Sequence, residues 1–234
     1  MDRRELLFNT LVVVTATFFS YLIYFIFVQT PPAQIEAGGV AQKILYFHAP
    51  AAYAMYLSGV VCFIGSAAYL VTPTDQRDAW ARAGAEVAVA FGAVMLISGP
   101  LWAKKAWGVY WAWEPRLVTT MLSVLIYIAV VVMRAFAGDG EAERKFAAAL
   151  GVLGTVNLPI IHYSVQKWGG VHPQVVGKGG LKHPDMKTAL FMGFGAMTLL
   201  ALLLLVSRAR LAIAKARIAR AEEHAAGLGL LDEA

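Results

Sequence analysis

The 234-residue sequence contains only one cysteine, Cys62, and few charged residues. A single cysteine excludes an internal disulfide, a paired-thiol redox motif and haem attachment through a CxxCH motif. Charged residues make up 15% of the chain and hydrophobic residues 59%, whereas soluble domains average about 25% and about 45–50% respectively. This composition excludes an ordinary soluble domain and leaves a membrane protein as the class to test.

The apolar residues gather in six runs, each close to the length that a helix needs to cross a bilayer. A hydrocarbon core about 30 Å thick requires roughly 20 apolar residues per helix, and backbone groups in lipid must pair within their own segment. The predicted spans are residues 6–28, 49–71, 83–103, 117–137, 146–165 and 188–207. We therefore predict an all-α polytopic membrane protein, with residues 1–207 as one six-helix transmembrane domain and 208–234 as a cytoplasmic C-terminal tail that continues the sixth helix.

The flanking charges predict the orientation of the spans. Arg3 and Arg4 precede the first run, as in a signal peptide, but this run exceeds the usual signal core of about 7–15 residues, so we expect a retained helix. Six spans put both termini on one side, which receives 12 of the 20 lysine and arginine residues. The positive-inside rule places that side in the cytoplasm. The net charge of +5 is therefore attributed to topology and not to nucleic-acid binding.

Three longer connections, residues 29–48, 104–116 and 166–187, fall on the opposite side, where we expect the function to reside. Several residues near the span ends carry structural expectations. Pro50 fits the first turn of the second helix, where its missing N–H costs nothing. Pro159 should kink the fifth span, and Asn157 should satisfy the backbone groups that it frees. Arg134, near the end of the fourth span, can extend its side chain to the interface.

The connection after the third span is unusually rich in aromatic residues. Residues 102–116, WAKKAWGVYWAWEPR, hold four of the six tryptophans. An interfacial aromatic belt is the alternative explanation, but it accounts for one or two tryptophans near a helix end and not for this density. Indole rings offer large contact surfaces at little entropic cost. The connection therefore suits a large, planar, mostly apolar ligand with charged edges.

Four of the five histidines, His48, His162, His172 and His183, lie at or near the same predicted face. A lone histidine near an interface is usually structural, but neutral imidazole is also a standard axial ligand of haem iron, and two give six-coordinate iron. A membrane redox cytochrome would place facing histidines inside the spans. Only His162 lies there, which counts against that class.

The quoted segments resemble a known family. Residues 107–119, WGVYWAWEPRLVT, look like the tryptophan-rich signature of haem-handling membrane proteins. Residues 44–53, with His48, and 157–172, NLPIIHYSVQKWGGVH, resemble the CcmC family, haem exporter protein C of cytochrome c maturation. The length and six spans fit CcmC better than the related CcmF and CcsA, which are generally larger. Two positions depart from the family pattern: Glu114 replaces the usual Asp, and Lys167 precedes Trp168 where paired tryptophans are frequent.

The resemblance implies that the protein binds haem b, iron protoporphyrin IX, at the periplasmic face of the bacterial inner membrane. By position, His48 matches the first axial ligand and His172 the second, with His183 as the alternative. The porphyrin would be held by Trp107, Tyr110, Trp111, Trp113, Glu114, Arg116 and Trp168. Lys104, Lys105 and Arg116 are the nearest basic residues for the propionates. The implied partners are the haem chaperone CcmE, the transporter subunits CcmA and CcmB, and the small membrane protein CcmD.

We accordingly expect a haem-binding and haem-transfer protein without enzymatic activity. A permease subunit without bound haem is the alternative from another class. Such a protein should carry polar or ionisable residues at mid-membrane. The spans offer little beyond Glu86, near the inner end of the third span, and Asn157 in the fifth.

Overall fold

The computed structural model describes residues 2–34, 38–138, 140–170, 172 and 180–229, and this part of the chain contains helices but no strands. Six long helices follow one another: α1 (Arg3–Tyr24), α2 (Leu45–Val71), α3 (Asp75–Trp107), α4 (Pro115–Phe136), α5 (Glu141–Trp168) and α6 (Pro184–Gly227). A π-helical turn, η1 (Phe25–Gln29), extends α1, and a 3₁₀ helix, η3 (Gly39–Ile44), leads into α2. Each of the six is long and apolar enough to cross a membrane. The predicted all-α fold with six spans is confirmed.

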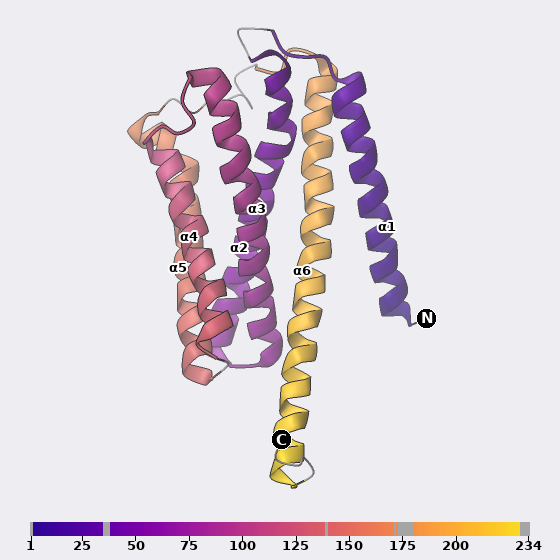
Figure 1. Ribbon diagram of the computed structural model, residues 1–234, viewed down its shortest axis with the longest axis vertical. Coiled ribbons are helices and arrows are strands. Elements are labelled where there is room, and N and C mark those ends of the chain that lie inside the picture. Colours follow the sequence, from indigo (N-terminus) through magenta and orange to yellow (C-terminus); the bar gives the residue numbers. More distant parts are fainter. Residues whose placement is uncertain (1, 35–37, 139, 171, 173–179, 230–234) are drawn as a thin grey trace.

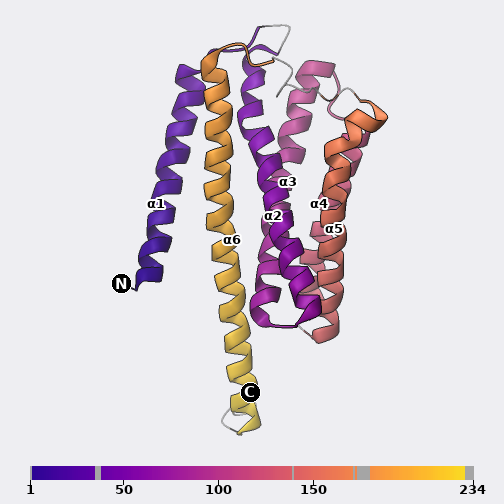
Figure 2. The same cartoon turned by 180° about the vertical axis from the view of Figure 1, so that it is seen from behind.

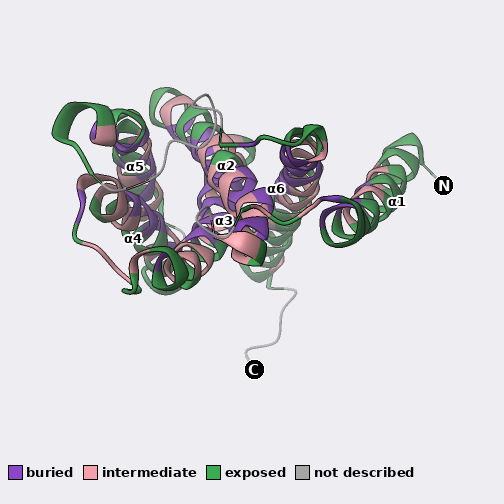
Figure 3. Cartoon of the chain, turned by 90° about the horizontal axis from the view of Figure 1, so that it is seen from above, coloured by how far each residue is buried: buried purple, intermediate pink, exposed green. Residues whose placement is uncertain are grey.

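The helices run alternately up and down, so the connections separate into two groups (Figure 1). The described ends of the chain lie toward the same end of the bundle as the short α2–α3 and α4–α5 turns, and the three longer connections meet at the opposite end, as Figure 2 also shows. Seen from above, α2 and α3 form the centre, α4 and α5 pack on one side, and α6 packs on the other (Figure 3). Helix α1 is outermost and contacts α6.

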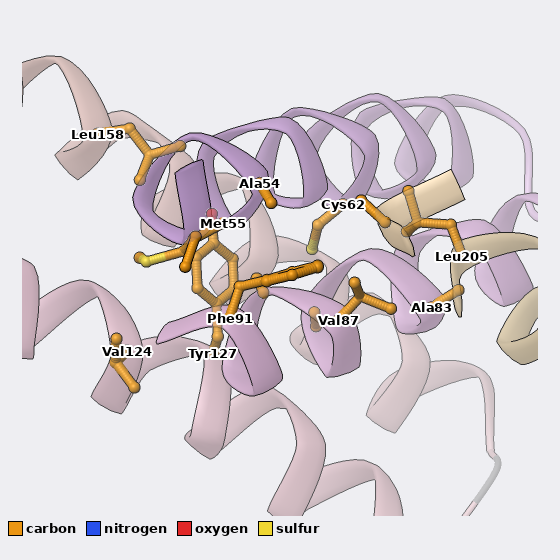
Figure 4. Close-up of a cluster of buried hydrophobic side chains, with 14 of the residues drawn as sticks. Ala54, Met55, Cys62, Ala83, Val87, Phe91, Val124, Tyr127, Leu158 and Leu205 are labelled. Carbon is orange, nitrogen blue, oxygen red and sulfur yellow. The ribbon is translucent and has the colours of Figure 1, made fainter. Parts of the chain in front are cut away.

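The central pair α2–α3 is packed around small residues. A Cβ added at Gly84 of α3 would lie 2.4 Å from the backbone nitrogen of Cys62 in α2, so only glycine permits this approach. Cys62 is fully buried in a cluster that includes Met55, Phe91 and Tyr127 (Figure 4). This tight packing fixes how α2 and α3 are positioned relative to each other, and both helices contribute to the candidate site.

The start of α2 differs from the prediction. The helix begins at Leu45, so Pro50 lies in the second turn and His48 lies inside the helix, because η3 adds helical turns before the apolar run. Pro50 removes the N–H that would pair with the carbonyl of Tyr46. Helix α6 approaches at this point: a Cβ at Gly193 would lie 2.6 Å from the Tyr46 carbonyl oxygen and 2.9 Å from Pro50 Cγ.

The expected role of Asn157 in compensating for Pro159 is also wrong. Its side-chain Nδ2 donates instead to the carbonyl of Thr119, at 2.7 Å, and to Ser123 Oγ, at 2.7 Å. Both acceptors belong to α4, so the amide fastens α5 to its neighbour. A buried amide in an apolar bundle needs such partners, because an unpaired polar group there is costly.

Arg134 does not extend to the interface as expected. Its side chain is only 3% exposed and pairs with Asp78 of α3 at 2.8 Å. Arg144 of α5 pairs with Asp75 of α3 at 2.9 Å and lies 3.8 Å from Asp78. Acidic residues in the first turn of α3 therefore pair with arginines of both α4 and α5.

Helix α6 continues without interruption to Gly227 and passes beyond the other helices (Figure 1). The predicted helical continuation after residue 207 is confirmed up to that point; residues 230–234 lie outside the described part. Two ion pairs join this helix to α3: Arg208 with Glu86, at 2.5 Å, and Arg220 with Asp75. The C-terminal part of α6 is therefore attached to the bundle by charge as well as by apolar packing.

Candidate functional site

His48 lies half-buried between α2 and α3. Its Nδ1 is 2.9 Å from the hydroxyl oxygen of Ser98, and that hydroxyl is 2.7 Å from the carbonyl oxygen of Val94, one turn earlier in α3. The next residue, Gly99, lies against the imidazole: a Cβ there would be 3.2 Å from His48 Cε1. Two consecutive residues of α3 thus contact the ring: Ser98 makes a hydrogen bond to it, and Gly99, which has no side chain, lets it lie against the helix.

The last turns of α3 carry the first two tryptophans of residues 102–116, the tryptophan-rich segment. Trp102 and Trp107 belong to the helix, and their rings pack edge to face with centroids 5.4 Å apart. Lys104 Nζ donates to the carbonyl of Gly108 at 2.9 Å and lies 5.3 Å from the ring centroid of Tyr110. The predicted connection of residues 104–116 is therefore shorter, because α3 continues to Trp107 and α4 begins at Pro115.

The loop itself presents exposed aromatic rings. Trp111 and Trp113 also pack edge to face, with centroids 6.0 Å apart and an interplanar angle of 76°. Trp113 is 80% exposed, and Tyr110 and Trp168 are exposed as well. The indole nitrogen of Trp111 is buried and has no acceptor among the described residues. The rings thus form two angled pairs and not one flat stack.

A second group of contacts joins the start of α4 to the connection between α5 and α6. Glu114 is buried, and its Oε2 accepts a hydrogen bond from the backbone N–H of His172 at 3.1 Å. Gly170 permits this approach, because a Cβ there would lie 2.6 Å from the same oxygen. Arg116 donates from Nη2 to the carbonyl of His162 at 3.0 Å, and its Nη1 lies 3.5 Å from His172 Nδ1. Residues far apart in sequence are thus held together at the end of the bundle with the long connections.

The structure sorts the predicted residues into these two groups. Glu114, Arg116 and His172 are brought together, and His48 is held separately by α3. His183 has a structural role as the N-cap of α6, where its Nδ1 accepts from the backbone N–H of Asp185 at 3.2 Å. The intervening residues 173–179 lie outside the described part. The contact residues that sequence reasoning missed are Ser98, Gly99 and Gly170; a Ser-Gly-Pro sequence near the end of an apolar run was the available signal for the first two.

Among the described residues, no three His, Cys, Asp or Glu side chains cluster closely enough to hold a metal ion by themselves.

Six membrane-length helices define a polytopic membrane protein, and most of its tryptophans and histidines lie at the end that holds the candidate site. The family model of CcmC, heme exporter protein C, matches residues 2–226. The chain belongs to this family.

Curated relatives of the chain carry the name heme exporter protein C. The Escherichia coli K12 protein is 31% identical over 183 residues, which cover 76% of this chain and 73% of the relative. The Haemophilus influenzae protein is 29% identical over 180 residues, covering 75% and 72% respectively. The Bradyrhizobium diazoefficiens protein is 34% identical over 135 residues, covering 57% of this chain and about half, 51%, of the relative. The resemblance seen in the sequence is confirmed.

Proposed function

We propose that the protein binds haem b at the end of the bundle where the three long connections meet and hands it to the periplasmic chaperone CcmE. Membership of the heme exporter protein C family assigns the chain to haem handling in cytochrome c maturation. Delivery to CcmE, the type of haem and the residues that hold it belong to this proposal. The protein acts by binding and transfer, without covalent chemistry by its side chains.

The observation that carries the proposal is the contact of His48 with Ser98. Its Nδ1 is engaged by Ser98, and Nε2 is the ring atom through which it would coordinate iron. Ligating histidines characteristically use one ring nitrogen for the metal and the other for a neighbouring polar group. His172, which is fixed at its backbone by Glu114, is the proposed second ligand. The capping role of His183 supports this choice over the alternative.

The remaining candidate residues fit the periphery of a haem. Buried donors without a described acceptor, Trp111 Nε1 and Arg116 Nε, suit the carboxylates of the propionates. We assign the porphyrin faces to the rings of the tryptophan-rich segment and of Trp168, which offer apolar contact. The residues proposed for this contact are Trp107, Tyr110, Trp111, Trp113 and Trp168. Lys104 Nζ donates to the carbonyl of Gly108, whereas Arg116 keeps an Nε without a described acceptor, which favours Arg116 for the propionates.

The proposed location is the bacterial inner membrane with the haem site facing the periplasm, and the proposed partners are CcmA, CcmB and CcmD in addition to CcmE. The alternative of a permease subunit finds little support in the bundle. Asn157 is bonded to α4, and Glu86 is paired with Arg82 and Arg208. Their polar groups therefore hold helices together and do not line a path for solutes.

The test is the absorption spectrum of the purified full-length chain with hemin added. We expect a six-coordinate spectrum for the wild type and for His183→Ala, since His183 caps a helix. His48→Ala and His172→Ala should each remove one axial ligand, giving five-coordinate haem or loss of haem. A spectrum unchanged by His48→Ala would contradict the proposed ligand, and the absence of any Soret band in the wild type would favour the permease.

A further inference from the structure

We propose that Ser98 is a positioning residue that fixes the tautomer of His48, so that Nε2 presents its lone pair to iron. The inference rests on the proposed function, because it concerns the ligand atom of that site. Ser98 lies in α3, 50 positions along the chain from His48. Its part is to orient the ligand without touching haem.

The hydrogen bonds of the Ser98 hydroxyl determine which ring nitrogen of His48 carries the proton. A serine hydroxyl has one proton and two lone pairs. Ser98 lies 2.7 Å from the carbonyl oxygen of Val94, which can only accept, so the single proton is directed there. Toward His48 Nδ1, 2.9 Å away, the hydroxyl oxygen then acts as acceptor. A neutral imidazole carries one N–H, so a proton on Nδ1 leaves Nε2 with its lone pair free.

The packing of α3 against α2 places the His48 ring next to Ser98. Ser98 and Gly99 are adjacent in α3, and they contact the Nδ1 and Cε1 atoms of the same ring. A Cβ added at Gly99 would lie 3.2 Å from Cε1, so the glycine lets the imidazole lie directly against α3 beside the Ser98 hydroxyl. The position of α3 relative to α2 is set further along by the contact of Gly84 with Cys62. The packing thus places the ring beside the hydroxyl that sets its tautomer.

His172 offers an informative contrast. The guanidinium of Arg116, 3.5 Å from His172 Nδ1, has only donors, so Nδ1 acts as the acceptor in that contact. The two proposed ligands therefore differ in their neighbours: a hydroxyl that can accept a hydrogen bond faces Nδ1 of His48, whereas a group that can only donate faces Nδ1 of His172.

The first measurement uses the full-length chain without haem, labelled with ¹⁵N in histidine. Two-bond ¹H–¹⁵N spectra distinguish protonated from unprotonated ring nitrogens, and the His48 signals are identified by their loss in His48→Gln. We expect a protonated Nδ1 in the wild type, the same state in Ser98→Thr, which keeps the hydroxyl, and loss of this preference in Ser98→Ala. Ser207→Ala is the matched control, because Ser207 makes the same hydroxyl bond to a carbonyl one turn earlier, at 2.6 Å, but in α6.

The second measurement is a hemin titration of the same variants with determination of the reduction potential. Loss of a polar partner behind a ligating histidine lowers metal affinity by about 10-fold or more and makes the ligand less basic. Ser98→Ala should therefore bind hemin about 10-fold more weakly and with a higher potential, and Ser98→Thr and Ser207→Ala should match the wild type.

The outcomes separate the two proposals. Suppose that the chain binds hemin but His48 carries its proton on Nε2, or that Ser98→Ala leaves the tautomer, the hemin affinity and the reduction potential unchanged. Either result overturns the role of Ser98 alone. A chain with the expected Ser98-dependent tautomer that takes up no hemin overturns the proposed function instead, and the role of Ser98 toward iron with it.

Discussion

Gly99 decides how closely α3 can approach the imidazole of His48. In Gly99→Ala the new methyl group would lie 3.2 Å from His48 Cε1, so the ring must shift by a few tenths of an ångström. Such a shift strains its 2.9 Å contact with Ser98. Overpacking of this kind costs about 1–3 kcal/mol. We expect weaker hemin binding in a spectrophotometric titration of Gly99→Ala.

A matched glycine separates this effect from a loss of stability. A Cβ at Gly195 of α6 would also lie 3.2 Å from an aromatic carbon, Phe18 Cε1 of α1, away from the candidate site. Gly195→Ala should lower thermal stability to a similar extent while keeping the hemin affinity of the wild type. Equal loss of hemin affinity in both variants would show that Gly99 acts only through packing.

Buried charge at the other end of the bundle contributes to the packing of α3 against α4. Arg134 is almost completely buried against Asp78. Removal of one member of a buried pair leaves an uncompensated charge, which costs about 3–5 kcal/mol. In Arg134→Ala we expect the lower part of this range, because Arg144 lies 3.8 Å from the same carboxylate. Denaturant unfolding of the purified chain in mild detergent measures the change.

The control for Arg134 is an ion pair with the same charges on the surface of a single helix. Lys145 and Glu141 lie 2.6 Å apart in the first turns of α5, and both side chains are exposed. Solvent screens such pairs, so Lys145→Ala should leave unfolding unchanged. If both variants lost the same stability, burial of Arg134 would not be the reason for its contribution.

The sequence predicted which segments form helices, but it did not predict all their boundaries. Apolar length identifies a span, whereas the ends depend on polar residues outside the apolar run. Helix α3 begins at Asp75, well before the predicted residue 83, because Thr74 caps it by accepting from the N–H of Arg77 at 3.3 Å. Acidic residues in the first turn add a favourable interaction with the helix dipole. The predicted spans were therefore correct in number and too short at their polar ends.

The same limit applies to the candidate site. The tryptophan-rich segment was identified from residue type and density, which the sequence displays directly, and His48 was singled out through the resemblance to the family. The partnership of His48 with Ser98 depends on the register between α2 and α3, and that register is set by close contacts such as Gly84 against Cys62. Likewise, the contact of Glu114 with His172 joins positions 58 residues apart. Pairing across helices is a property of packing, which a single sequence does not record.

The two ends of the bundle differ in chemistry. Ion pairs that involve Arg134, Arg144 and Arg220 gather at the end with the short turns. The candidate haem residues occupy the end with the long connections, beside exposed aromatic rings such as Trp113. This separation is expected if the first end faces the cytoplasm, where arginine-rich flanks are retained, and the second faces the periplasm.

Reporter fusions test this orientation directly. We expect a chain truncated after Lys167 to give an active alkaline phosphatase fusion, because that enzyme matures only outside the cytoplasm. A chain truncated after Arg144 should instead give a fluorescent GFP fusion, since Arg144 lies at the opposite end of α5. Truncation after Gln76, in the first turn of α3 at the same end as Arg144, is the control and should behave like Arg144. The reverse pattern would place His48 and the tryptophan-rich segment in the cytoplasm, from which haem could not be handed to a periplasmic chaperone without a further step across the membrane.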